Sequence, residues 1–424
     1  MKKLTIRLLC LALCLGVLVS LVPAVSAESE ETQKQINMEG TAVEQIQPAT
    51  GGAVGTPVRI SGETQWNPLL GEAPEETGAI QNQQVDAAPD KGYIFYDETP
   101  FADVLDYICQ QMKQRKATFS VTYYTTDRYD YNTFWTTMFE YALSHTGVGN
   151  EGDYLRWIWR KRTPGLYGYE GQYITYTYGM TYLTTATQEA WVDTEVAKLI
   201  NTLNLNSGTD YQKVKRLYDW MCSNITYDHT GLAQTIDNSP LTWTAYKALR
   251  YGTCVCQGYA SLFYRVMLEC GVDTRIIAGN PQAPHAWNIV KLGSYYYNLD
   301  STWDAEYTQA GRSYRYFLCS PANFNSDHIR YDEYDTSDFH YYYPMSSKNY
   351  VAGAAIPGDM DGNERLTTDD AVRLLLNIMF GSGDYPVPAS ANRDTNGDGK
   401  VTTDDAVHLL LHVMFGATDY PLAA

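Results

Sequence analysis

The C-terminal end of the chain is a tandem repeat, and no other feature restricts the fold of a segment so strongly. The stretch GDMDGNERLTTDDAVRLLLNIMFG returns 35 residues later as RDTNGDGKVTTDDAVHLLLHVMFG. Internal repetition this close predicts two equivalent structural units. Each copy opens with a loop rich in Asp and Asn and continues into an apolar helix, at Ala371 to Phe380 in the first copy and Ala406 to Phe415 in the second. We therefore expect a pair of loop–helix units.

Both repeat loops carry oxygen-bearing side chains in the pattern D-x-[DN]-x-[DN], with an acid at loop position 12. Alternate oxygens in such a loop converge on one hard cation, so the pattern predicts Ca²⁺. Position 6 normally needs glycine, which the second loop supplies as Gly399, whereas the first loop has Glu364 and should be strained or weaker. The predicted ligands are Asp359, Asp361, Asn363, the carbonyl of Arg365 and Asp370 in the first loop, and Asp394, Asn396, Asp398, the carbonyl of Lys400 and Asp405 in the second.

A loop–helix duplicated at this spacing, with Asp at position 12, resembles a type I dockerin over residues 357–424. The resemblance implies two structural Ca²⁺ ions, calcium-dependent folding, and docking onto the cohesin domain of a scaffoldin in a cellulosome-type, polysaccharide-degrading assembly. In that family loop positions 10 and 11 help to choose the partner, and here both copies read Thr-Asp, which suggests two alternative docking orientations. The other interpretation is a pair of generic calcium loops without a partner.

The first 27 residues have the features of a secretory signal peptide. Lys2, Lys3 and Arg7 precede an apolar stretch from Leu8 to Val22, and Ala27 ends a cleavage site of small residues. No later stretch is apolar and long enough to span a bilayer. We therefore expect a secreted protein without a transmembrane segment, extracellular or attached to a cell-surface scaffold.

Composition limits the partners and the cysteine chemistry. A net charge of −18 argues against nucleic acid or an anionic membrane surface as partner. Six cysteines remain after the signal, too few for a disulfide scaffold, although one or two bridges are possible and their pairing is open. These cysteines are Cys109, Cys222, Cys254, Cys256, Cys270 and Cys319.

The rest of the chain divides by composition and periodicity. Residues 28–91 are rich in Gln, Glu, Thr, Gly and Pro and predict a mostly disordered lead-in. Residues 92–187 mix helical and alternating strand patterns and predict an accessory α/β region. Residues 188–343 carry the candidate chemistry, and residues 344–356 are predicted to link them to the tail.

The segment 188–343 predicts a layer of helices on an antiparallel sheet. DYQKVKRLYDWMCSN and CQGYASLFYRVMLECG place apolar residues at helical spacing, and Gly271 supplies the stop of the second helix. TRIIAG, HAWNIVKL and SYYYNLD read as strands, the last two joined across Gly293-Ser294. The predicted class is α+β, with a small all-α tail.

The hairpin brings a histidine and an aspartate together. A turn at Gly293-Ser294 sets a register that places Trp287 opposite Asp300. His285 shares the face of Trp287, so it is a diagonal neighbour of Asp300, roughly 7–8 Å away at Cα. Such a pair can orient an imidazole and stabilise its cation. Cys256 lies in the first turn of its helix, where free N–H groups and the dipole favour a thiolate. We predict a catalytic Cys–His–Asp set.

The motifs CQGYA, HAWN and YYNLDSTWD resemble, in this order, the transglutaminase-like superfamily, a papain-related group with a Cys-His-Asp triad. The resemblance covers roughly residues 190–340. By it, Cys256 matches the nucleophile, His285 the histidine and Asp300 the aspartate, while Cys254 has no counterpart. A metal half-site at C-x-C lacks a second ligand pair, and a Cys254–Cys256 disulfide would silence the nucleophile.

The resemblance implies a monomeric catalytic domain that forms a thioester with peptide or glutamine-type amides of a protein substrate. Water as acceptor gives a peptidase or amidase, and an amine gives a crosslinking transferase; we favour water because nothing in the sequence visibly excludes it. The superfamily also has non-catalytic members, so a binding module in the same scaffold assembly is the alternative. A glycoside hydrolase would need paired carboxylates across a cleft, and no such pair can be picked out.

Overall fold

The structure is a computed structural model, and it describes residues 57–61, 65–67, 91–126, 130–230, 240–280 and 284–423. The predicted signal peptide and most of the lead-in lie outside these residues. Across the described part of the chain, no helix combines the length and the apolar character needed to cross a membrane.

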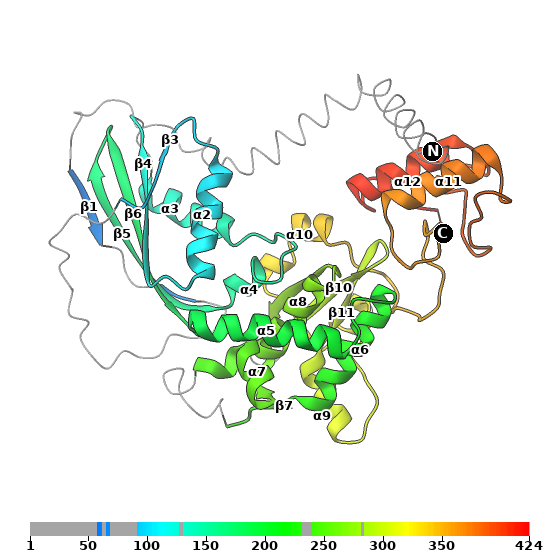
Figure 1. The fold of residues 1–424 in the computed structure, drawn as a ribbon, viewed down its shortest axis with the longest axis horizontal. Helices are drawn as coiled ribbons and strands as arrows, with labels where there is room; N and C mark the ends of the chain where they lie inside the picture. Colours follow the sequence, from blue (N-terminus) through cyan, green and yellow to red (C-terminus); the bar gives the residue numbers. More distant parts are fainter. Residues whose placement is uncertain are drawn as a thin grey trace.

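The N-terminal unit is a sheet with helices packed on one face (Figure 1). Its elements are β1 (Pro57–Ser61), β2 (Gln65–Trp66), β3 (Tyr93–Tyr96), α2 (Phe101–Lys113), β4 (Thr118–Tyr124), α3 (Tyr131–Ala142), α4 (Asp153–Arg156), β5 (Trp159–Tyr169) and β6 (Tyr173–Tyr182). The strand order is β1-β5-β6-β4-β3, with β2 also paired to β5. On β6, Ile174, Tyr176, Tyr178 and Met180 are buried, as expected when alternate side chains face the helices.

The lead-in, predicted to be mostly disordered, contains two short strands, β1 and β2. β1 pairs antiparallel with β5 from Pro57 to Ser61. After β2, the buried side chain of Asn67 donates hydrogen bonds to the carbonyls of Arg156 (2.9 Å) and Trp159 (2.8 Å). Composition misses such strands because backbone hydrogen bonds to an existing sheet edge hold them, whatever their apolar content.

The central unit has the predicted helices on an antiparallel sheet. Its elements are α5 (Ala186–Thr202), α6 (Asp210–Asn224), β7 (Thr226–Tyr227), η2 (Pro240–Trp243), α7 (Ala245–Tyr251), β8 (Thr253–Cys254), α8 (Cys256–Glu269), β9 (Thr274–Gly279), β10 (His285–Leu292), β11 (Tyr295–Leu299), α9 (Ser301–Gln309), η3 (Pro321–Asn323), η4 (Asp332–Tyr334) and α10 (Ser337–Tyr342). The sheet order is β11-β10-β9. α8 is buried from Gln257 to Leu268 and packs on β9 and β10.

The predicted hairpin register is confirmed. Leu292 pairs with Tyr295 across a turn in which Gly293 has φ +64°, and the pairing runs to Asn288 opposite Leu299. The next residue pair in this register is Trp287 and Asp300. The candidate histidine and aspartate therefore lie on the same face, as the alternation of side chains requires.

Residues 344–350, predicted as part of a linker, contact the central unit. The backbone N–H of Tyr296 donates to the carbonyl of Pro344 at 2.8 Å, and the N–H of Ser346 donates to the carbonyl of Tyr296 at 3.0 Å. Tyr350 stacks on Tyr211 of α6 with ring centroids 5.2 Å apart. This stretch is thus packed onto the central unit rather than extended away from it.

The tail forms two helices, α11 (Thr368–Phe380) and α12 (Thr403–Phe415), which lie side by side at one end of the molecule (Figure 1). Each begins three residues before the predicted start, because a threonine before it closes a capping box with the Asp at loop position 12. The two loop–helix units of the tail contact each other through the apolar residues Met360, Ala371, Leu374, Ala406 and Leu409.

Candidate active site

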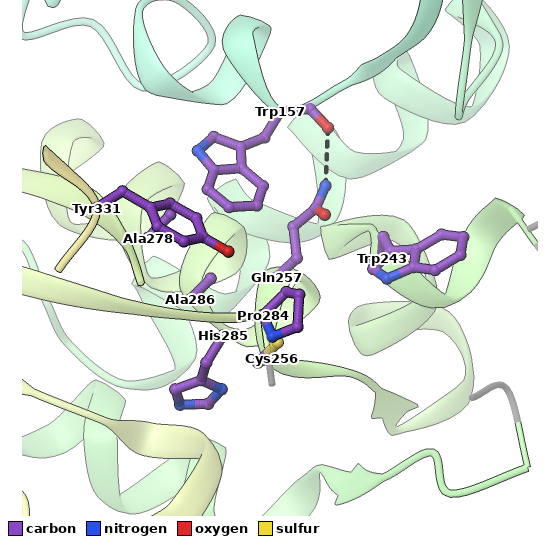
Figure 2. A pocket seen from close by; sticks show the side chains of 9 residues that line it. All are labelled: Trp157, Trp243, Cys256, Gln257, Ala278, Pro284, His285, Ala286 and Tyr331. Carbon is purple, nitrogen blue, oxygen red and sulfur yellow. Dashed lines mark hydrogen bonds between the residues drawn. The ribbon is translucent and has the colours of Figure 1, made fainter. Parts of the chain in front are cut away.

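Cys256 is the first residue of α8 and lines a pocket on the central unit. Val255 before it has an extended backbone and no capping side chain. The N-terminal N–H groups and the dipole of α8 therefore act close to the half-buried Cys256 thiol. The pocket is lined by Trp157, Trp243, Cys256, Gln257, Ala278, Pro284, His285, Ala286 and Tyr331 (Figure 2).

His285 and Asp300 form a buried hydrogen-bonded pair. His285 opens β10, and Asp300 is the N-cap of α9. The Nε2 atom of His285 lies 2.8 Å from Oδ2 of Asp300. The other carboxylate oxygen, Oδ1, accepts hydrogen bonds from the backbone N–H groups of Thr302 (2.8 Å) and Trp303 (3.2 Å). The cap of α9 therefore fixes the carboxylate that faces the imidazole.

Charges in the site favour an imidazolium. Burial on its own would lower the pKa of His285, but the charge and hydrogen bond of Asp300, with a further hydrogen bond to Cys256, raise it to about 10. Burial would raise the pKa of Asp300, but the positive charge and hydrogen bond of His285, and those of His328, hold it well below its usual range. Of the residues predicted as a triad, His285 and Asp300 are hydrogen-bonded, and Cys256 and His285 line the same pocket.

Two tryptophans hold the ring of His285. Its ring centroid lies 5.0 Å from that of Trp303 and 6.0 Å from that of Trp287, with interplanar angles of 25° and 28°. Both indoles flank the site and contact the imidazole directly. They therefore restrict its rotation while Asp300 sets its orientation.

One histidine in the site was given no role by the sequence. His328 is fully buried, and its Nε2 atom lies 3.0 Å from Oδ2 of Asp300, the oxygen that also contacts His285. The sequence distance from Asp300 is 28 residues, and no local pattern marks the position. His328 is the last residue of the stretch FLCSPANFNSDH.

The wall of the pocket combines residues of both units. Trp157 comes from the N-terminal unit, and its carbonyl accepts a hydrogen bond of 2.8 Å from Nε2 of Gln257, next to Cys256 (Figure 2). Trp157 is buried, and its indole N–H has no hydrogen-bond partner among the described residues. Of the two aromatic residues just upstream of Cys256, Trp243 lines the pocket, whereas Tyr246 packs on Trp191.

The central segment matches a known family. Residues 197–301 match the sequence model of the transglutaminase-like superfamily. These residues form a transglutaminase-like domain. Parts of the chain are also similar to kyphoscoliosis peptidase: 29% identity over 153 residues of the Homo sapiens protein, covering 31% of this chain and 22% of that one, and 28% over 167 residues of the Mus musculus protein, covering 35% and 25%. The chain thus spans about a quarter of the length of these relatives.

Two solved structures are similar to parts of the chain. One, described as a TGase, has a TM-score of 0.24 and 14% identity and covers 50% of this chain and 60% of that one. The other, described as a candidate cysteine protease from Cytophaga hutchinsonii, has a TM-score of 0.22 and 16% identity and covers 34% and 58%. At these TM-scores neither carries an argument about this chain.

All six cysteines predicted for the mature chain are free thiols, so the bridges left open by the sequence are not formed. Within the transglutaminase-like domain, Cys254 is buried and not bonded to Cys256. Burial, followed by the nearby charge of Cys256, raises the pKa of the Cys254 thiol well above its usual value. Cys254 therefore stays a neutral thiol beside the candidate nucleophile.

The first tail loop brings three of its predicted ligand side chains close together. In the first loop, carboxylate oxygens of Asp359, Asp361 and Asp370 all lie within 4.8 Å of one another. Asp359 accepts hydrogen bonds from the N–H groups of loop positions 4, 5 and 6, and Asp394 in the second loop has the same three contacts. This set of hard oxygen donors fits Ca²⁺.

Glu364 is strained as the sequence predicted. Its φ is +63°, in the left-handed region where Gly399 of the second loop has +83°. One carboxylate oxygen of Glu364 is also buried without a hydrogen-bond partner in the described part of the chain. A side chain at this position therefore adds two local costs that the second loop avoids.

Proposed function

We propose that the transglutaminase-like domain is a cysteine hydrolase or acyltransferase that acts on peptide or glutamine-type amides. The observation that supports this most is the series Cys256, His285 and Asp300, in which a helix N-terminus meets a histidine held by a buried carboxylate. Nucleophile, base and orienting group within hydrogen-bond reach are what thiol-based acyl transfer requires.

The chemical steps follow from these positions. His285 takes the proton of Cys256, and the thiolate attacks the amide carbonyl to form a tetrahedral adduct. Collapse of the adduct breaks the C–N bond as His285 returns the proton to the leaving amine, and a thioester remains on Cys256. Water or an amine then attacks the thioester with His285 as base, which releases acid or new amide and regenerates the thiol. The backbone N–H of Cys256 at the start of α8 is one oxyanion donor.

Hydrolysis is the favoured outcome. The similarity to proteins named as peptidases supports water as acceptor, although it covers only about a third of this chain. Cys256 is half-buried and lines the pocket, so water can reach a thioester formed there. An amine would attack the thioester from the same position as water. The product therefore distinguishes hydrolysis from acyl transfer.

The test is to incubate the reduced, signal-free protein with casein and dansylcadaverine. We expect new peptide termini or hydrolysed glutamines in wild type, and at least a thousandfold lower rate in Cys256→Ala and His285→Ala, as roughly found when a triad member is removed. Fluorescent incorporation of the amine would instead indicate a transferase. No turnover on casein or on a glutamine-peptide panel, with an ordinary Cys256 thiol, would leave the domain as a binding module.

For the tail we propose two structural Ca²⁺ ions and docking onto a cohesin of an extracellular scaffold. The ligands would be the ten loop residues predicted from the sequence, and bound calcium would screen the repulsion between their carboxylates. The repeated loop hydrogen bonds and the three gathered carboxylates support this. Delivery to a scaffold on the cell surface, after export by the N-terminal signal, completes the proposed role.

A further inference from the structure

Asp300 is fully buried and has more hydrogen bonds than its interaction with His285 alone would need. Oδ1 accepts two backbone N–H groups, and Oδ2 is shared by His285 at 2.8 Å and His328 at 3.0 Å. A buried carboxylate becomes neutral unless donors compensate for the lost water. His328 therefore supplies Oδ2 with a second partner in addition to His285.

Only one neutral tautomer of His328 avoids an unsatisfied buried donor. It is fully buried, and its Nδ1 atom has no hydrogen-bond partner among the described residues. A proton on Nδ1 would be an unsatisfied buried donor, whereas a bare Nδ1 costs less, so the proton belongs on Nε2. In this tautomer Nε2–H donates to Oδ2 of Asp300 and Nδ1 faces aromatic rings.

The surroundings of His328 hold this arrangement. The ring of Phe324 stacks on the imidazole with centroids 3.9 Å apart, and Trp303 lies at 4.4 Å. The backbone next to His328 is fixed to the strand β9, because the N–H of Asn280 donates to the carbonyl of Ile329 at 2.9 Å. The imidazole therefore cannot turn away from Asp300 without moving both the aromatic contacts and the strand.

We propose that His328 is a positioning residue, which donates to Oδ2 of Asp300, aims that oxygen at His285 and keeps the buried carboxyl ionised. His328 does not face the pocket and touches no reacting atom. It acts through Asp300, which in turn holds the charge of His285. This inference rests on the function proposed above and names a further residue of the same site.

The consequence appears at acidic pH. Without the donor from His328, the carboxylate of Asp300 is less stabilised, so Asp300 takes up a proton at a higher pH. His285 then loses its counter-charge, and the Cys256 thiolate becomes less favoured. The acid limb of the pH profile is the range in which the rate of Cys256 modification falls as the pH is lowered. Its midpoint should rise by about one to two pH units, the size expected for the loss of one hydrogen bond to an ionised group.

Other titratable groups near Asp300 do not produce the same shift. Burial raises the pKa of Cys222 and of three nearby tyrosines, Tyr218, Tyr227 and Tyr259, above their ordinary values. None of these groups therefore titrates in acid. Burial also raises the pKa of Asp304 to about 6, but this group is present in every variant and cancels in a comparison. These groups are Tyr218, Cys222, Tyr227, Tyr259 and Asp304.

The experiment is the rate of iodoacetamide modification at Cys256, mapped by mass spectrometry on the full reduced chain from pH 2 to 9, so that the range includes the acid in which Asp300 takes up its proton. His328→Leu removes the donor, and His328→Phe does so with a ring retained in case the leucine variant does not fold. His328→Gln keeps an N–H at the position of Nε2. His340→Leu is the matched control, because it removes an exposed His–Asp hydrogen bond of 2.8 Å to Asp335.

We expect the acid limb to shift upward in His328→Leu and His328→Phe, and to stay within a few tenths of a unit of wild type in His328→Gln and His340→Leu. An unshifted limb in a folded donor-free variant would overturn the inference, as would equal shifts in the glutamine and leucine variants. If wild-type Cys256 reacts like an ordinary thiol, the proposed function itself is contradicted. If wild-type Cys256 is a reactive thiolate but the acid limb does not shift in the His328 variants, only this inference is contradicted.

Discussion

At the scale of single residues, the site depends on keeping two opposite charges buried together. Removing His285 and Asp300 from water costs free energy, and the pair persists because each charge has specific partners. Four N–H groups reach the carboxylate of Asp300, while two indoles and one carboxylate surround the ring of His285. The charge state of this pair should therefore be visible in the stability of the whole fold.

The His285–Asp300 pair should make the free energy of unfolding depend on pH. The pKa of His285 is raised to about 10, so its contribution is complete below the unfolded value of about 6.5 and is lost as the pH rises toward 10. The pKa of Asp300 is lowered, so its contribution is complete above about 3.9 and is lost in stronger acid. His285→Gln should therefore cost most, about 3 kcal/mol, between roughly pH 4 and 6.5.

Urea unfolding of wild type and His285→Gln at pH 5, 7 and 9 checks this dependence. We expect the difference between the two proteins to shrink from pH 5 to pH 9. A difference that grows with pH would mean that His285 is buried as a neutral ring and forms no ion pair with Asp300.

The closeness of Cys256, His285 and Asp300 could be predicted because each has a local determinant. Cys256 opens a helix, and the register of one short hairpin brings His285 beside Asp300. His328 and Trp157 have none: the first reaches Asp300 from 28 residues away, and the second contacts Gln257 from 100 residues away. Such contacts depend on how separate units pack, which periodicity does not encode.

At the scale of elements, the two repeat loops of the tail form an internal comparison. They share hydrogen bonds and capping boxes, but position 6 is Glu364 in one and Gly399 in the other, both with positive φ. A side chain in this region costs about 1 kcal/mol relative to glycine. Glu364→Gly should therefore stabilise the calcium-loaded tail by about 1 kcal/mol, and Gly399→Ala should destabilise it by a similar amount.

Calorimetry of the full chain in calcium and in excess EDTA measures both effects. We expect the transition of the tail to move up in Glu364→Gly, to move down in Gly399→Ala, and to disappear in EDTA with a loss of helical circular dichroism. Unchanged helical signal in EDTA would count against calcium-coupled folding, and a lower midpoint for Glu364→Gly would show that this carboxylate has a favourable partner.

Elements were predictable where apolar spacing or turn chemistry was strong. The hairpin at Gly293 and the buried helix α8 follow directly from such patterns. Strands β1 and β2 did not, because they lie in a polar stretch and are held by the edge of β5. The helices α11 and α12 began early because their caps lie inside the segment that reads as a calcium loop.

At the scale of the whole molecule, the three units are joined by polar contacts near the site and the tail. Arg275 of β9 makes a two-pronged ion pair with the buried Asp153 of the N-terminal unit, at 2.7 and 2.9 Å. On the other side, Arg365 of the tail reaches Asp210 of α6 at 3.1 Å. The N-terminal unit is therefore fixed where Trp157 enters the pocket, so it is part of the site rather than an appendage.

Trp157→Ala should open the pocket to larger groups at Cys256. Trp157 lines the pocket, and only its backbone carbonyl bonds to Gln257, so loss of the indole removes steric exclusion without touching Cys256, His285 or Asp300. We expect the ratio of the modification rates by 5-iodoacetamidofluorescein and by iodoacetamide to rise roughly tenfold, the scale of steric discrimination in an apolar pocket. Trp191→Ala is the control, because this half-buried indole packs on Tyr246 and does not line the pocket. An unchanged ratio in folded Trp157→Ala, or an equal rise in the control, would mean that the N-terminal unit does not shape access to Cys256.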